Sequence, residues 1–271
     1  MRRSFVFRSA AAFTLVELMV VMFIVGLIVL SASPYLRQGI KAAQSNAAAR
    51  DFYTDLAYAR SLAIKTGLPH LVEVCPGVAT SGGTFTAVPG YMVIECSTTT
   101  GSGATAVTTA NFSASQCTST NVCAELANDA PSAVTGVRRE VNLLKGGHEA
   151  QSNADTAIKQ IAGVTFGVAG SGVVGTPDAP SSTPPTDGVD LGCPGASTVR
   201  RRFFFQKNGQ AVDDSSHAPC GGTYYITSNM ELASLGASGD TTLDRAVEFT
   251  SAGGIKVYRW DTNMTGSNKW R

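Results

Sequence analysis

The sequence is short of charged residues. Only 15% of its 271 residues are Asp, Glu, Lys or Arg, and the 21 basic residues nearly balance the 20 acidic ones. So few charges, together with 28 glycines, argue against a coiled coil. A net charge of +1 excludes binding of nucleic acid through overall charge, and 44% hydrophobic residues argue against disorder throughout. The length then predicts one or two globular domains.

Motifs for metal binding and catalysis are missing as well. The six cysteines form no C-x-x-C pair and the three histidines are scattered, so we expect no metal site. Gly170 to Gly175 match G-x-G-x-x-G, but Thr176 and Pro177 follow where a dinucleotide site needs a helix. There is no nucleophile elbow and no P-loop. We therefore expect no cofactor and no enzymatic activity.

A long apolar run lies near the N-terminus. Residues 13–30 are interrupted only by Thr14, Glu17 and Gly26, and as a helix they would span about 27 Å, close to the hydrocarbon thickness of a bilayer. Small residues suited to a cleavage site precede the run, so we expect cleavage to leave it in the mature protein. Three arginines ahead of it predict a cytoplasmic N-terminal end and export of everything after Leu30.

Glu17 is the single carboxylate inside this run. A carboxylate in an apolar span is costly unless it is neutralised or paired, which makes Glu17 a functional candidate. The spacing of Thr14 and Glu17 also fits a capping box, in which both side chains satisfy free N–H groups at a helix start. Cleavage between Ala12 and Phe13 would create an amino group one helical turn from Glu17. This amine could pair with Glu17 between neighbouring subunits.

The segment AAFTLVELMVVMFIVGLIVLSASP resembles the N-terminus of type IV prepilins. In that family a prepilin peptidase cuts before the phenylalanine and methylates it, which implies processing at Ala12 and Phe13. The family nearly always has glycine at the position of Ala12. The resemblance assigns Glu17 to the guidance of assembly, and Gly26 and Pro34 to positions where the stem helix loosens.

The same resemblance implies a location and partners. The chain is expected to cross the inner membrane once before assembly, and then to occupy the periplasm and a pilus on the cell surface. Its expected partners are the prepilin peptidase, an inner-membrane assembly platform and other pilin subunits.

An amphipathic helix is predicted after Pro34. Its apolar positions recur at spacings of four, three and four residues, which is one face of a helix. Gly67 and Pro69 supply the stop signals. The residues of this face are Phe52, Leu56, Ala59 and Ala63.

The helix end ARSLAIKTG at 59–67, followed by a strand at 71–75, resembles the FimT/GspH family of minor pilins and pseudopilins. This implies a minor pilin that enters or primes a type IV pilus and displays a β domain at its tip or surface. Two alternatives remain open. One is a DNA-binding minor pilin for natural transformation, and the other is a GspH-type minor pseudopilin of a type II secretion system.

The predicted fold is α+β and type IV pilin-like, with a long N-terminal helix packed on an antiparallel β-sheet or sandwich. We expect a leader (1–12), a transmembrane and assembly helix (13–34), an amphipathic stem helix (35–67) and an exported β-rich domain (68–271). Expected strands are 71–75, 91–96, 137–144, 199–205, 223–227, 246–250 and 255–260, with hairpin turns at Asn208-Gly209 and Ala252-Gly253-Gly254. Two insertions, near 97–124 and 169–188, are expected to be exposed loops. The first has no charged residue and the second holds four of the 11 prolines.

The cysteines suit an exported domain, where disulfides persist. Six thiols allow fifteen pairings, so the sequence does not fix the connectivity. Cys193 and Cys220 flank a predicted hairpin, and Cys117 and Cys123 are close enough in sequence for a local bridge. Cys75 and Cys96 are then paired by elimination.

The last predicted hairpin contains the candidate DNA contacts. Some members of the family resemble DNA receptors that use a G-R-x-R motif there, and this chain keeps the second cation only as Lys256. Strand alternation places Lys256, Tyr258 and Trp260 on one face, where a cation and two aromatics could hold a phosphate and stack a base. The alternative is that the aromatic residues pack under a loop. Together with Arg259, these three residues form the expected site.

Overall fold

In the computed structural model, the described residues are 14–76, 89–100, 107–110, 136–143, 150–153, 156–160, 164–167, 173, 175–185, 187–193, 201–214, 216–228, 244–261 and 269–271. The chain divides into two compact units, Met1–Ile40 and Lys41–Arg271. The expected leader and the residues Ala12, Phe13, Cys117 and Cys123 lie outside the described part.

Among the described residues there is one helix, α1, which runs from Leu15 to Thr66. The two helical segments expected at 13–34 and 35–67 are therefore one helix of 52 residues, continuous through Gly26 and Pro34. A proline inside a helix removes one hydrogen bond of the ladder, and the flanking turns keep theirs. The helix ends where the sequence predicts, at Gly67, whose φ of 72° is the left-handed conformation that glycine adopts without strain.

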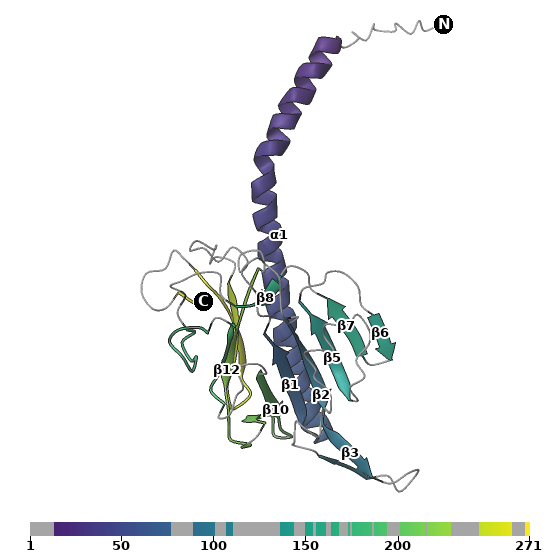
Figure 1. Ribbon diagram of the computed structural model, residues 1–271, viewed down its shortest axis with the longest axis vertical. Coiled ribbons are helices and arrows are strands. Elements are labelled where there is room, and N and C mark those ends of the chain that lie inside the picture. Colours follow the sequence, from purple (N-terminus) through teal and green to yellow (C-terminus); the bar gives the residue numbers. More distant parts are fainter. Residues whose placement is uncertain are drawn as a thin grey trace, which may run out of the picture. The chain divides into compact units, whose positions relative to one another are not determined.

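The strands of the described part of the chain lie in three sheets, and Figure 1 labels several of these strands. The larger two have the orders β11-β10-β1-β2-β5-β7-β6 and β14-β13-β12-β8, with β9 also paired to β12, and the third is the hairpin β3-β4. The strands are β1 (His70–Cys75), β2 (Gly90–Glu95), β3 (Ser97–Thr100), β4 (Val107–Ala110), β5 (Val137–Asn142), β6 (Ala150–Asn153), β7 (Thr156–Gln160), β8 (Val164–Phe166), β9 (Val189–Leu191), β10 (Arg201–Phe205), β11 (Ala211–Asp213), β12 (Gly222–Ser228), β13 (Arg245–Phe249) and β14 (Ile255–Arg259).

The C-terminal half of α1 shares one hydrophobic core with both large sheets. All four residues of the predicted amphipathic face are fully buried in it. Phe52 lies at its centre, with ring centroids 4.6 Å from Tyr91 of β2 and 4.9 Å from Tyr224 of β12. Edge-to-face aromatic pairs of this kind add to the free energy gained from burial alone. The apolar face of the helix therefore joins the two sheets.

The expected strands and the two hairpins are present, and the structure corrects three other expectations. The sheets are not wholly antiparallel, because β5 and β7 pair in parallel. The insertion near 97–124 contains the hairpin β3-β4. The insertion near 169–188 is not simply exposed, since Val173 and Thr176 are buried. The strands β6, β7, β8 and β9 were not predicted.

The structure contains the predicted disulfide between Cys193 and Cys220. The pairing of Cys75 with Cys96 is wrong, although each of them is in a disulfide. The β1–β2 register places Cys75 opposite Gly90, while the Cys96 N–H donates to the carbonyl of Pro69 at the other end of the ladder. Cys96 lies six residues after Gly90, so at about 3.4 Å per residue the two cysteines are separated by roughly 20 Å along the ladder, far beyond disulfide reach.

Candidate functional site

The start of α1 is closed by a capping box. The Glu17 N–H donates to Thr14 Oγ1 at 3.2 Å, and the Thr14 N–H and hydroxyl both donate to Glu17 Oε2 at 3.3 Å. Two backbone N–H groups that the helix leaves unpaired are thereby satisfied. The capping interpretation of Glu17 is confirmed for the single chain. The contact is exposed, so the Glu17 carboxylate stays accessible to a second partner in an assembly.

The first turns of α1 expose their apolar side chains. Every large hydrophobic residue from Leu15 to Leu30 is exposed, from 48% at Val25 to 74% at Leu15. Exposed apolar surface of this extent is typical of a segment that contacts other chains or lipid.

We find no helix among the described residues whose length and apolar character would let it cross a membrane.

Three sequence signals meet at Arg60 of α1. Its Nε donates to the carbonyl of Gly209 at 3.1 Å, and its Nη2 lies 3.5 Å from the carbonyl of Ala252. Gly209 belongs to the turn between β10 and β11, and Ala252 to the turn between β13 and β14. One guanidinium on the helix thus holds the tips of two hairpins from different sheets.

The glycines of these two turns are required where they are. Gly209 and Gly253 have φ values of 78° and 81°. A Cβ at Gly253 would lie 2.0 Å from the Gly209 carbonyl oxygen and 2.6 Å from Arg60 Nε. Only glycine fits such an approach. The ARS helix end and both turn signals therefore define one packed junction, formed by Arg60, Gly209, Ala252 and Gly253.

The residues proposed for DNA contact are largely engaged within the chain. Lys256 Nζ lies 3.0 Å from Asp178 Oδ2, in an ion pair between exposed side chains. Trp260 is buried, with its ring centroid 5.0 Å from that of Trp270. Tyr258 packs against the same cluster, whereas Arg259 is exposed. The shared face of the strand is confirmed, and so is the packing of its aromatic residues.

A polar cluster lies beside this face. The hydroxyl of Thr176 donates to Glu248 Oε2 at 2.6 Å and lies 3.1 Å from Thr223 Oγ1. The Ser181 N–H donates to Asp190 Oδ2 at 2.9 Å. These contacts hold residues 175–181 over the outer face of β12 and β13. We call this segment the strap.

Burial sets the titration of the cluster. Desolvation raises the pKa of Glu248, against the opposing effect of the Thr176 hydrogen bond. Burial raises the pKa of Tyr225, whose oxygen accepts the Thr176 N–H, to about 12. On the exposed side, the hydrogen bond from Lys256 lowers the pKa of Asp178. Among the described residues, no group of His, Cys, Asp or Glu is arranged to hold a metal ion.

The Glu248→Gln variant should change how stability depends on pH. Because the folded-state pKa of Glu248 is raised, its contribution to stability is fully present below its ordinary pKa and is lost as pH rises through the folded value. The variant lacks this loss, so its stability relative to the wild type should improve from pH 4 toward pH 7. Chemical unfolding at a series of pH values measures this difference. A constant difference between the two proteins would contradict it.

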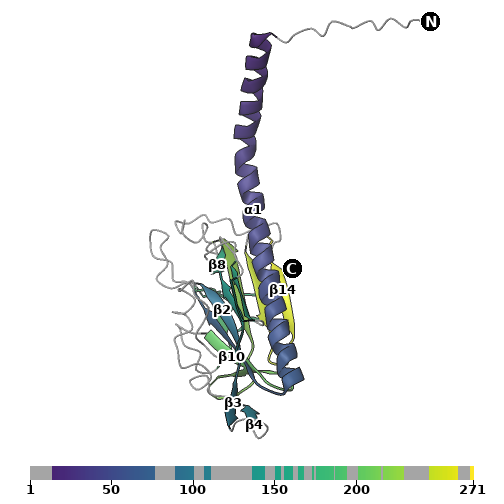
Figure 2. The ribbon, with the colours of Figure 1, turned by 90° about the vertical axis from the view of Figure 1, so that its right-hand side faces the viewer.

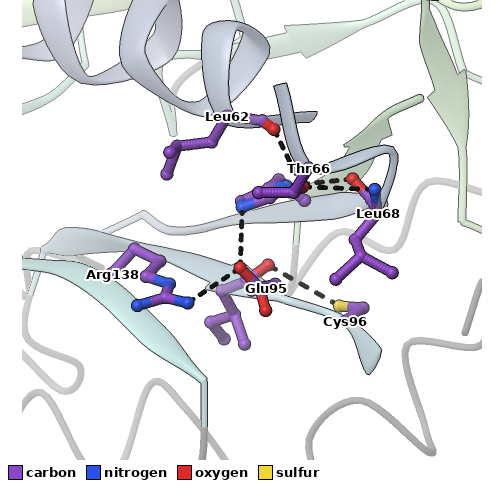
Figure 3. A network of polar contacts seen from close by, with 8 residues as sticks. Leu62, Thr66, Leu68, Glu95, Cys96 and Arg138 are labelled. Atoms are coloured by element: carbon purple, nitrogen blue, oxygen red, sulfur yellow. Dashed lines mark hydrogen bonds and ion pairs between the residues drawn. The ribbon is translucent and has the colours of Figure 1, made fainter. Parts of the chain in front are cut away.

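A second polar network joins the end of α1 to the larger sheet (Figure 3). Glu95 Oε2 lies 2.8 Å from Arg138 Nη2 and 3.6 Å from His70 Nε2. His70 is fully buried, and desolvation lowers its pKa. The imidazole is therefore neutral at pH 7, which is consistent with a structural role. Thr66 Oγ1 accepts the Leu68 N–H at 3.2 Å and completes the turn into β1.

The comparisons with known proteins bear on the N-terminus. Residues 7–33 match the family model described as the prokaryotic N-terminal methylation motif. Neither the curated proteins nor the solved structures gave a match. The motif supports a type IV pilin-like protein. It implies processing by prepilin peptidase and assembly with other pilins.

The sequence signals and the structure overlap only in part. Arg60, Gly209 and Gly253 were recognised as parts of motifs, and the structure brings them together. The roles of Asp178, Thr176 and Glu248 were missed. No local signal marks the pair of Asp178 and Lys256, which are 78 residues apart in the sequence. The processing residues Ala12 and Phe13 lie outside the described part of the chain.

Proposed function

We propose that this chain is a minor pilin, cut before Phe13, that enters a type IV pilus through α1 and presents its β-rich unit on the filament. The main support for this proposal is that the methylation motif at residues 7–33 overlaps a helix whose large apolar residues are all exposed up to Leu30. Before assembly the apolar segment anchors the precursor at the inner membrane. Afterwards it packs among the same segments of other subunits. The role is structural and not catalytic.

The minor role, as opposed to that of the main subunit, rests on the β-rich unit. Its two insertions, near 97–124 and 169–188, add a hairpin and the strap to the sheets. Such additions suit display at a tip or surface, where they meet no neighbouring subunit. They are harder to accommodate in a subunit that repeats along a close-packed shaft.

Two related roles would use the same kind of chain. A minor pseudopilin of a type II secretion system would use the same α1, and only its machine would differ. A DNA-binding role gains no support from the last hairpin, because Lys256 is paired with Asp178 and Trp260 is buried. We therefore propose assembly and not DNA capture.

The direct test of the proposal is the N-terminal residue of the chain recovered from cells. Processing as a pilin requires a methylated Phe13 and retention of the apolar residues that follow it.

A further inference from the structure

The strand β14 forms one edge of its sheet and leaves part of its backbone facing outward. The Thr250 N–H donates to the Gly254 carbonyl at 2.8 Å, so Gly254 belongs to a hydrogen-bonded pair with β13. In an antiparallel ladder such pairs alternate. Lys256 and Tyr258 therefore bond to β13, while the N–H and C=O groups of Ile255, Val257 and Arg259 face outward.

The chain itself fills one end of this edge. The Arg259 N–H donates to the Arg271 carbonyl at 2.7 Å, and the Arg271 N–H donates to the Arg259 carbonyl at 3.1 Å. The Asp261 N–H donates to the Lys269 carbonyl at 2.8 Å, which extends the pairing. Within the described part of the chain, the outward groups of Ile255 and Val257 have no backbone partner. The edge thus already pairs with an added segment at Arg259, and the outward N–H and C=O groups of Val257 and Ile255 are available to pair with another.

A groove lies between this edge and α1. Tyr53, Ala57, Arg60, Gly253 and Ile255 line a hollow of about 220 Å³, and we call it the edge groove. A second hollow of about 360 Å³ adjoins it at Arg60 and extends past Ile64 to Lys65. Figure 2 shows β14 beside the C-terminal half of α1.

Apolar and cationic side chains share this surface. Tyr53, Ile64 and Val257 are 40%, 52% and 39% exposed. Neither hollow has an Asp or Glu in its lining, whereas Arg60 and Lys65 are present. Arg259 is exposed and alternates onto the same face of β14 as Val257. No ion pair with another described residue holds Lys65 or Arg259.

We propose that the edge groove binds an extended peptide segment of another protein, rich in carboxylates, by strand addition to β14. The backbone of the segment pairs with Ile255 and Val257, in line with the pairing that residues 269–271 already make. Alternate side chains of an added strand face opposite sides, so one set lies on Tyr53 and Val257. Carboxylates of the segment pair with Lys65 and Arg259. This inference does not depend on processing at Phe13.

Strand addition explains the surface better than nucleic-acid binding does. A polyanion bound by charge alone would use neither the two outward peptide groups of β14 nor the apolar side chains of Tyr53 and Val257 beside them. The aromatic residue best suited to stack a base, Trp260, is buried. An extended, acidic peptide contacts all three features, because its backbone pairs with the peptide groups, its apolar side chains pack on the apolar residues and its carboxylates pair with the cations.

The test measures binding of a fluorescent nonapeptide to the full-length chain in detergent, by polarisation. Its residues 1 and 9 are Glu, residues 3, 5 and 7 are Val, and the even residues are Thr, so that its carboxylates and valines lie on one face of the strand, as Arg259 and Val257 do on β14. Val257→Pro removes an outward N–H that β13 does not use, a position where edge strands tolerate proline. It should weaken binding by about tenfold, the effect of losing roughly 1.4 kcal/mol. Arg259→Gln should weaken binding, while Lys256→Gln, which neutralises a cation on the opposite face, should not.

A second probe protects the test against misfolding of the proline variant. The same peptide with N-methyl groups on its three valines, whose N–H groups face the edge in an antiparallel pair, cannot donate there, and it should fail to bind the wild-type chain. A peptide with Lys in place of Glu should fail as well. Equal binding of the methylated peptide would overturn strand addition in favour of a site that acts by charge alone. The same conclusion would follow if a single-stranded oligonucleotide bound the wild-type and Val257→Pro chains alike and displaced the peptide.

Discussion

Glu17→Gln is expected to reduce recovery of the chain in filaments sheared from the cell surface by more than about tenfold, because an apolar bundle makes an unmatched charge costly. Glutamine can replace glutamate in a capping box, so the variant keeps an acceptor for Thr14 but loses the charge. In the proposed assembly that charge neutralises the new amino group at Phe13 of a neighbouring subunit. Immunoblotting of the sheared and cell-bound fractions measures the effect.

Two companion variants separate assembly from capping. Thr14→Ala removes the threonine side chain from the capping box and keeps the carboxylate of Glu17. Loss of an exposed cap costs only roughly 1 kcal/mol of helix stability, so this variant should assemble to within about twofold of the wild type. Glu17→Ala should resemble Glu17→Gln. If capping were the whole role of Glu17, the glutamine variant would assemble normally and Thr14→Ala would resemble Glu17→Ala. Cleavage before Phe13 must be verified in each variant.

Gly253→Ala is expected to lower the free energy of unfolding by about 3 kcal/mol or more, because two costs combine. The φ of 81° is strained for alanine, and the new Cβ would lie 2.0 Å from the Gly209 carbonyl oxygen. The turn must then move away from Arg60, and the contact between the two hairpins opens. Chemical unfolding in detergent, followed by the fluorescence of the buried Trp260 and Trp270, measures the loss.

Gly67→Ala is the matched control. Gly67 has a φ of 72°, but a Cβ there would meet nothing within 4 Å. This variant carries the backbone strain alone, so it should cost about 1 kcal/mol. The difference between the two variants isolates the packing of the junction. Equal losses would show that the close approach at Gly253 does not stabilise the fold.

The sequence predicted the elements that depend on local chemistry. Phe52 and Leu56 lie at helical spacing and are buried as expected, because a helix repeats every 3.6 residues. The turn at Asn208-Gly209 forms because the Asn208 side chain accepts the Gln210 N–H at 3.0 Å and glycine takes the positive φ. The candidate residue Glu17 was found in the same way, as a charge inside an apolar run.

Features that depend on distant pairing were not predictable. The register of β1 against β2 separates Cys75 from Cys96, and no local pattern encodes that register. The strap is fixed by Thr176 and Glu248, which lie 72 residues apart in sequence. The groove at β14 likewise exists only because α1 and the last hairpin meet. Such contacts arise from the packing of whole elements.

The most direct test of the account is mass spectrometry of the N-terminal peptide of the chain extracted from membranes and sheared filaments. Digestion after glutamate should release residues 13–17, FTLVE, carrying one added methyl group. A peptide that begins at Met1, or a mature chain that begins beyond Leu30, would contradict processing as a pilin and the assembly role of α1.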